Sequence, residues 1–334
     1  MLKTLRILAL AAPFLGLLAA EARAQDTVTM RYMAERGELS AHELAVQLGY
    51  FKGTGIRFEN VGYSQGGPES LFALASGTAD IGTAATPAVL NAIASGNPFV
   101  AAYPTNGIDK TVHSTFAVLN DSPIHSIQDL AGKTIAVNTL GAHLDYTTRV
   151  ALASAGLPAN AAKLVTVPGP QLEQVLRSHQ VDVAAFGYWQ TTFAGLAQSH
   201  GGIRPVFTDT DVLGTIAGGF TVLRRDFVKA HPQAAQLFVK ESARALDYAR
   251  AHPAETKTIL ARVLKSRNEN PDLAQYFSGY GVRPGGLPTD RDVAFWIDVM
   301  TRSGQLQPGQ LTPSQVLLVT GDKRQAINQK ETAQ

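Results

Sequence analysis

The chain has 334 residues, no cysteine and a formal net charge of +2. The absence of cysteine excludes disulfides, thiolate catalysis, cysteine metal sites and a lipid-anchoring cysteine. The small charge, without a basic cluster, argues against nucleic acid and anionic membrane surfaces as partners, and the length predicts two domains or lobes.

The first 24 residues are predicted to be a secretory signal peptide. Lys3 and Arg6 precede the apolar stretch Ile7–Ala20, and Ala22-Arg23-Ala24 has the A-x-A pattern of a cleavage site. The apolar stretch is too short for a comfortable membrane span. We therefore expect cleavage after Ala24 and an exported, soluble protein.

The segment after the signal has the pattern of an α/β lobe. Alternating apolar residues predict a first strand at Thr27–Met33, and Ser40 is placed to cap a helix at His42–Leu48. Further strands are expected over 56–61, 80–84, 99–103 and 115–119. Thr86-Pro87 is typical of another helix start, because proline is tolerated in the first helical turn.

One phrase occurs twice in the chain. Gly67-Pro68-x5-Leu74-x-Ser76-x3-Asp80 is matched by Gly169-Pro170-x5-Leu176-x-Ser178-x3-Asp182. Each copy lies between two β-rich runs, and the apolar residues inside it have helical spacing. The pattern predicts a strand, a tight loop, a helix and a strand in each copy, and hence two similar α/β lobes.

The second lobe is predicted to be inserted into the first. A helical turn over 126–133, a strand over 134–137 and a helix over 143–155 lead to the second copy of the phrase. The strand Phe220–Leu223 then returns the chain to the first lobe, which ends in helices. We assign 25–114 and 219–334 to lobe one and 115–218 to lobe two, with two crossing segments near His113 and Gly219 as a hinge.

A serine hydrolase is one functional alternative. Gly62-Tyr63-Ser64-Gln65-Gly66 fits the G-x-S-x-G nucleophile elbow, between a strand and a helix as that pattern requires. No oxyanion motif precedes it, and the downstream His231 and His252 stand in His-Pro steps. The second copy of the repeat also has no elbow serine, so the turn has a structural explanation.

A binding site is the other interpretation of this loop. Free N–H groups and the dipole at a helix N-terminus attract anions, and Gly66-Gly67 lets a ligand approach the backbone. Thr86 and Gly141-Ala142-His143 open helices at equivalent strand ends. Tyr188-Trp189 follow a strand at the edge where open α/β sheets bind ligands, and Arg36 follows the first strand.

Several phrases resemble substrate-binding proteins of ABC importers. They include Leu48-Gly49-Tyr50-Phe51-Lys52, Ser76-Gly77-Thr78-Ala79-Asp80-Ile81-Gly82 and Asp129-Leu130-Ala131-Gly132-Lys133-Thr134. Pro87-Ala88-Val89-Leu90 and Arg225-Asp226-Phe227 continue the match. The similar subgroup binds aliphatic sulfonates, taurine, nitrate and thiamine-pyrimidine precursors. The resemblance implies an α/β, type II periplasmic-binding-protein fold that closes by hinge bending, a periplasmic location and an ABC permease as partner.

Two departures from the family pattern bear on the ligand. Many relatives have a Ser-Ser pair where this chain has Leu140-Gly141, and Trp-Asp-Pro where it has Gly187-Tyr188-Trp189. The wall is therefore predicted to be less polar than in sulfonate-binding relatives. We expect a small organic anion, an aromatic or apolar carboxylate or a sulfonate of similar shape, rather than nitrate.

These arguments lead to a non-enzymatic, monomeric binding protein without cofactor or metal, since the histidines lack metal-site spacing. A secreted serine hydrolase, a pyrimidine-precursor binding protein and the related pyrimidine-synthesising enzyme are the alternatives; that enzyme's cysteine-rich motif is absent. The predicted ligand-binding residues are Arg36, Ser64, Gln65, Gly66, Gly67, Thr86, Leu140, Gly141, Ala142, His143, Tyr188 and Trp189.

Overall fold

The computed structural model describes residues 27–64 and 66–318. The predicted signal peptide with its cleavage site after Ala24, and the predicted site residue Gln65, lie outside the described residues. Within them, no helix combines the length and apolar character needed to cross a bilayer.

A five-stranded sheet forms the centre of the first lobe, in the order β2-β1-β3-β10-β4. Its strands are β1 (Val28–Glu35), β2 (Ile56–Ser64), β3 (Ile81–Ala85), β4 (Phe99–Ile108) and β10 (Ile216–Arg224). β1 runs parallel to β2 and β3, whereas β10 is antiparallel to β3 and β4. The predicted strands of this lobe are all present, and β2 and β4 are longer than predicted.

A second five-stranded sheet has the order β7-β6-β8-β5-β9. Its strands are β5 (Thr115–Leu119), β6 (Thr134–Val137), β7 (Lys163–Thr166), β8 (Val183–Phe186) and β9 (Ile203–Thr208). β6 is parallel to β7 and β8, and β5 is antiparallel to β8 and β9. The central strands are buried on both faces, which explains their continuous apolar sequence.

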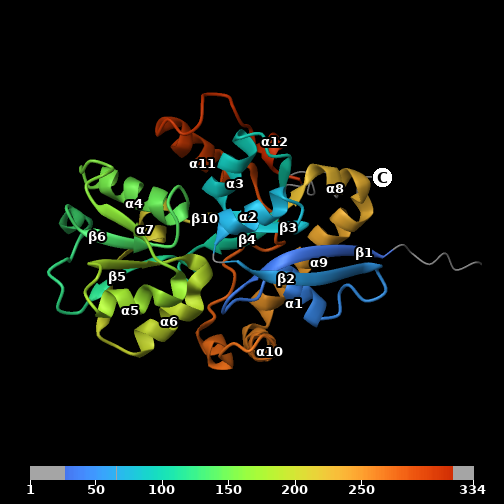
Figure 1. Cartoon of the computed structure of the whole chain (residues 1–334), viewed down its shortest axis with the longest axis horizontal. Coiled ribbons are helices and arrows are strands. Elements are labelled where there is room, and N and C mark those ends of the chain that lie inside the picture. Colours follow the sequence, from blue (N-terminus) through green and yellow to red (C-terminus); the bar gives the residue numbers. More distant parts are fainter. Residues whose placement is uncertain (1–26, 65, 319–334) are drawn as a thin grey trace, which may run out of the picture.

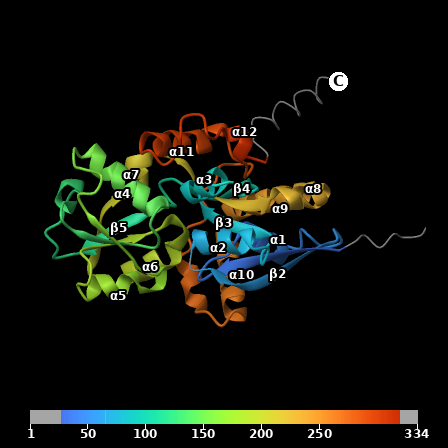
Figure 2. The same ribbon diagram turned by 45° about the horizontal axis from the view of Figure 1, so that its top comes forward.

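Helices cover both faces of each sheet. In the first lobe they are α1 (Ala41–Gln47), α2 (Gly67–Ala75), α3 (Thr86–Ala94), α8 (Arg225–Ala230), α9 (Pro232–Ala251), α10 (Pro253–Ser266), the 3₁₀ segment η4 (Pro271–Tyr276), α11 (Asp290–Arg302) and α12 (Pro313–Val316). In the second they are η1 (Ile127–Leu130), α4 (His143–Ser154), η2 (Gly169–Gln171), α5 (Leu172–Arg177), η3 (Tyr188–Gln190), α6 (Thr191–Ser199) and α7 (Asp209–Leu213). Figure 1 shows the second lobe in green beside the first, and Figure 2 shows α11 and α12 on the side of the first lobe opposite to α10.

Each lobe has an apolar layer on either side of its sheet. In the first lobe, Leu44 of α1 and Phe238 of α9 are fully buried on one side, and Trp296 of α11 is buried in a separate cluster. In the second lobe, α4 packs on one side through Leu144, and α5 packs on the other through Leu172. The cluster around Trp296 also includes Ala142, Tyr146 and Tyr188 of the second lobe, so the two lobes share part of their apolar packing.

The chain crosses between the sheets twice. One crossing joins β4 to β5 at residues 109–114, and the other joins α7 to β10. Gly219, which we placed in the second crossing, instead pairs with Ala85 of β3 and Asn106 of β4. Because β10 already begins at Ile216, the chain returns at residues 214–215, where Gly214 has a φ of 69°.

The repeated phrase has the same structure in both lobes. It forms α2 in the first and η2 with α5 in the second, each between strands as predicted. Its final aspartate lies where the following strand begins to pair with the neighbouring strand. The backbone N–H of Arg31 donates to Asp80 at 2.9 Å, and that of Thr134 donates to Asp182 at 2.7 Å. In return the aspartate N–H groups donate to the carbonyls of Arg31 and Thr134.

Candidate ligand-binding cleft

A cavity lies between the two lobes, at the carboxyl ends of β1, β6 and β8. It encloses about 790 Å³ of empty space, a volume that includes open solvent at its mouth. Its lining from the first lobe includes Glu35, Arg36, Glu38, Ser64, Gly66, Gly67, Thr83, Ala84, Thr105, Asn106 and Gly219, and from the second Asn138, Ala142, Gly169, Pro170, Tyr188, Trp189, Gln190 and Phe193.

The start of α2 forms part of the first lobe's wall. The Ser64 hydroxyl donates to the carbonyl of Gly66 at 2.7 Å and accepts the Gly66 N–H at 3.1 Å, which closes the turn before the helix. Gly67 packs so closely on β3 that a Cβ there would lie 2.7 Å from the Cβ of Ala84. This close approach explains the glycine in the first copy of the repeat.

Aromatic side chains form the opposite wall. Tyr188 is buried, and its ring lies against β10 of the first lobe, where a Cβ on Gly218 would be 2.5 Å from the ring. Trp189 is partly exposed and stands edge to face with Tyr188, at a centroid distance of 4.7 Å. Phe193 of α6 adds a third ring. Tyr188 therefore joins the lobes, and Trp189 and Phe193 leave apolar surface for a ligand.

Four predicted site residues do not line the cleft. Thr86 is fully buried and donates to the carbonyl of Gly218 at 3.0 Å. Leu140 is 54% exposed on the outer surface, and Gly141 belongs to the same turn with its N–H bound to Asp145. His143 is fully buried. Of that turn, Ala142 alone reaches the cavity, because α4 begins with its first side chains pointing into the core.

His143 is part of a buried polar network behind the aromatic wall. Its Nε2 lies 2.8 Å from a carboxyl oxygen of Asp209, and both side chains have no solvent exposure. The other oxygen of Asp209 accepts the N–H of Ser114, whose hydroxyl accepts the N–H of Tyr188. The network links α4, α7, Ser114 of the first crossing and Tyr188, so it positions the wall from behind.

The sequence analysis missed two carboxyl groups, Glu35 and Glu38. Burial raises the pKa of Glu35 to about 7, and the negative charge of Glu43 contributes to that rise. The pKa of Glu38 is raised well above its ordinary value by burial and by Glu35. Their spacing at the end of a strand, around the predicted Arg36, could have indicated them.

Arg36 lies at the mouth of the cleft. Its side chain is exposed, and its guanidinium stands over the ring of Tyr63 at 4.3 Å from the centroid. Among the described residues that line the cavity, it is the single basic one. The interior of the cleft is therefore more acidic than the sequence analysis predicted.

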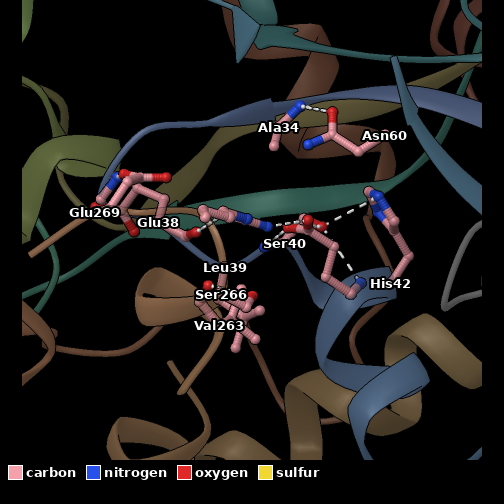
Figure 3. Close-up of polar contacts among 12 residues, drawn as sticks. Ala34, Glu38, Leu39, Ser40, His42, Asn60, Val263, Ser266 and Glu269 are labelled. Atoms are coloured by element: carbon pink, nitrogen blue, oxygen red, sulfur yellow. Dashed lines mark hydrogen bonds and ion pairs between the residues drawn. The ribbon is translucent and has the colours of Figure 1, made fainter. Parts of the chain in front are cut away.

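The cleft continues into an inner compartment beneath β1. Six residues line both parts: Glu35, Glu38, Thr83, Thr105, Asn106 and Trp189. The inner part is also lined by Met33, Ala34, Leu39, Ser40, His42, Glu43 and Tyr280. Figure 3 shows Glu38 beside Glu269, with Ser40 and His42 following at the start of α1. Burial lowers the pKa of His42 to about 4, so this imidazole is neutral at pH 7.

The two lobes contact each other around the cleft. Thr192 of α6 donates to Glu38 at 3.3 Å, and Tyr276 of η4 donates to Ser199 at 2.9 Å. A Cβ on Gly37 would lie 3.0 Å from the ring of Phe193. The cleft is thus enclosed by contacts between side chains of both lobes.

Comparison with known proteins assigns the chain to a family. The model of the NMT1/THI5-like family matches residues 41–256, so the chain belongs to that family. A Brucella abortus protein whose name calls it a binding protein is 24% identical over 249 residues, which are 73% of this chain and 74% of that protein.

Solved structures with the same fold include binding proteins and an enzyme. The periplasmic aliphatic sulphonate binding protein SsuA from Escherichia coli aligns with a TM-score of 0.70 at 19% identity, over 87% of this chain and 92% of that one. The desulfurization enzyme DSZB aligns with a TM-score of 0.61 at 17% identity, over 92% and 100%. The predicted fold is therefore confirmed: the chain has the fold of the periplasmic solute-binding proteins of ABC importers.

No metal site is formed by the described residues, in which no group of three or more His, Cys, Asp or Glu side chains is placed to hold an ion.

Proposed function

We propose that this protein is exported to the periplasm, captures a small organic solute between its lobes and delivers it to an ABC permease. The observation that carries the proposal is the cleft itself, which both lobes line and which combines the start of α2 with the rings of Trp189 and Phe193. Membership of the NMT1/THI5-like family and the shared fold support it.

The solute is proposed to be an organic acid with a flat or apolar body. Gly66 and Gly67 at the start of α2 and Ala142 before α4 place helix N-termini at the cavity, which favours an anionic head. Trp189 and Phe193 offer apolar surface to the body. SsuA, which binds aliphatic sulphonates, has the same fold and supports an acid of this kind.

Catalysis by Ser64 is the alternative that the geometry disfavours. The hydrogen bonds of its hydroxyl both go to Gly66, and in the described part of the chain no histidine contacts it. The histidine–aspartate pair of the second lobe is fully buried behind the cleft wall. We therefore propose binding without chemistry; labelling of Ser64 by a fluorophosphonate probe, abolished in Ser64→Ala, would contradict this.

A thermal-shift screen of carboxylates, sulfonates, nitrate and pyrimidines tests the function. A true solute should raise the stability by about 4 kcal/mol at a thousandfold excess over Kd. Trp189→Ala should weaken its binding by about 1–3 kcal/mol, because the ring loses its contact with the solute. Calorimetry measures this difference.

Phe72→Ala is the matched control, since Phe72 is 74% exposed on α2 and lies outside the cleft. Normal binding by Trp189→Ala, or tight binding of nitrate alone, would show that the aromatic wall has another role. Small-angle scattering with and without the solute should show compaction if the lobes close about the two crossings.

A further inference from the structure

The inner compartment presents two carboxyl groups, Glu35 and Glu38, that have few hydrogen-bond donors around them. The Glu35 carboxyl has no hydrogen bond from any residue in 27–64 or 66–318, although it lines both parts of the cavity. Glu38 receives one hydrogen bond, from Thr192 across the lobes. Two carboxyl groups held close together in an enclosed space repel each other, so such an arrangement favours a positive or N–H-bearing partner.

Nearby cations are already engaged. Arg267 lies buried against Glu43 in an ion pair, and Arg36 stands at the mouth over Tyr63. Neither guanidinium reaches the carboxyl of Glu35 in the described structure. The described residues also form no metal site here. A bound molecule can supply the missing donor.

A second observation points to the same kind of ligand from the other lobe. Asn138, at the end of β6, lines the cavity and is 9% exposed, yet its Oδ1 has no hydrogen-bond partner among the described residues. Its amide lies close to Gly66, with Nδ2 3.3 Å from where a Cβ would be. An unpartnered buried oxygen in a ligand cavity is satisfied when the ligand supplies a hydrogen bond.

We propose that the solute carries an ammonium or other N–H-bearing nitrogen that binds the Glu35 and Glu38 carboxyl groups in the inner compartment. The ligand class is then a small amino acid in the general sense: an acidic head at the start of α2, an apolar body along Trp189, and a nitrogen group at the opposite end. This inference rests on the proposed solute-binding function and specifies its ligand.

Matched pairs of probes that differ only in the nitrogen test the proposal by calorimetry. 4-(Aminomethyl)benzoate is compared with 4-ethylbenzoate, and 3-aminopropanesulfonate with butanesulfonate. We expect the amine-bearing member of at least one pair to bind about tenfold tighter or more, as charge-assisted hydrogen bonds at an enclosed site do. The Glu35→Gln/Glu38→Gln double variant should lose this preference, whereas Glu59→Gln, on the exposed face of β2, should keep it.

The pH dependence gives an independent measurement. The affinity for 4-(aminomethyl)benzoate should rise between pH 6 and pH 8, because Glu35, with its pKa of about 7, loses its proton in this range. Glu43 and the neutral His42 on α1, Arg267 and Glu269 after α10, and the Tyr188 hydroxyl face the same region, and the variant Glu35→Gln isolates the contribution of Glu35 from theirs. In this variant the rise should disappear.

The results distinguish two failures: a solute without a nitrogen group, and the absence of solute binding. Equal or tighter binding of the methyl-bearing member in both pairs, or a preference that survives in the double variant, would overturn the inference and leave solute binding intact. Failure of all four probes to bind, while another compound of the thermal-shift screen binds, would also overturn the inference alone; failure of every compound of that screen would overturn the function. Thermal unfolding of each variant establishes that it is folded, so a lost preference reports on the carboxyl groups.

Discussion

The two lobes share one framework and differ in what they present to the cleft. Both place a helix after the first parallel strand pair, and in both the repeat's aspartate, Asp80 or Asp182, accepts a backbone N–H of the neighbouring strand. The first lobe contributes the charged side chains of the lining, at the end of β1, while the second contributes aromatic and amide side chains after β6 and β8. The backbone scaffold is thus repeated, whereas the strand-end residues that line the cleft differ between the lobes.

The largest change in the free energy of unfolding is expected at the buried His143–Asp209 pair of the second lobe. Asp209→Ala removes the acceptor of the His143 ring and of the Ser114 N–H, both fully buried, and should lower the free energy of unfolding by about 3–5 kcal/mol. Denaturant titration measures the change.

Asp298→Ala serves as the control for this prediction. Its carboxylate pairs with Arg302 on the exposed surface of α11 and should contribute about 0.5 kcal/mol or less. A similar loss in both variants would mean that burial of the His143–Asp209 pair has no special role.

The two repeat aspartates should contribute different amounts to stability, although both accept a backbone N–H of the neighbouring strand. Asp80 is buried and accepts hydrogen bonds from the backbone and the guanidinium of Arg31, so Asp80→Ala should cost about 2–3 kcal/mol. Asp182 is exposed and its carboxylate accepts the N–H of Thr134, so Asp182→Ala should cost about 1 kcal/mol.

Denaturant titration of the two single variants compares them directly. Equal losses of stability would indicate that the hydrogen bond from the backbone N–H to the aspartate accounts for its role in both lobes. The ion pair with Arg31 would then contribute nothing measurable.

A further effect on the free energy of unfolding comes from Glu35, in the acidic wall of the first lobe. The folded-state pKa of Glu35, raised to about 7, means that stability is lost as the pH rises from about 4.5 through 7. Glu35→Gln should therefore stabilise the solute-free protein by about 1–2 kcal/mol at pH 8, with little effect at pH 5, after allowance for partial solvent access.

Thermal unfolding at the two pH values, with Glu59→Gln as the exposed control, measures this gain. A gain of the same size at pH 5 would show that packing, rather than ionisation of Glu35, is responsible.

Much of the framework was predictable from local sequence patterns. The repeated Gly-Pro phrase predicted the same strand–helix–strand unit in both lobes, and Ser40 predicted the start of α1, where it forms a capping box with Glu43. Such features depend on neighbours in the chain, because helix periodicity and capping act over a few residues. The family resemblance, carried by short phrases in order, was likewise readable and is confirmed.

The tertiary structure decided which strand-end residues meet the cleft. Sequence alone assigned His143 and Leu140 to the site, but His143, at the start of α4, is buried in the core, and Leu140, in the loop before α4, is exposed. The sequence could not indicate that contacts from α6 of the other lobe enclose Glu35 and Glu38. The environment of a carboxyl group depends on segments that are far away in the chain. The exposure of these side chains and the pKa of each carboxyl group arise from the packing of the two lobes, which joins segments far apart in the sequence.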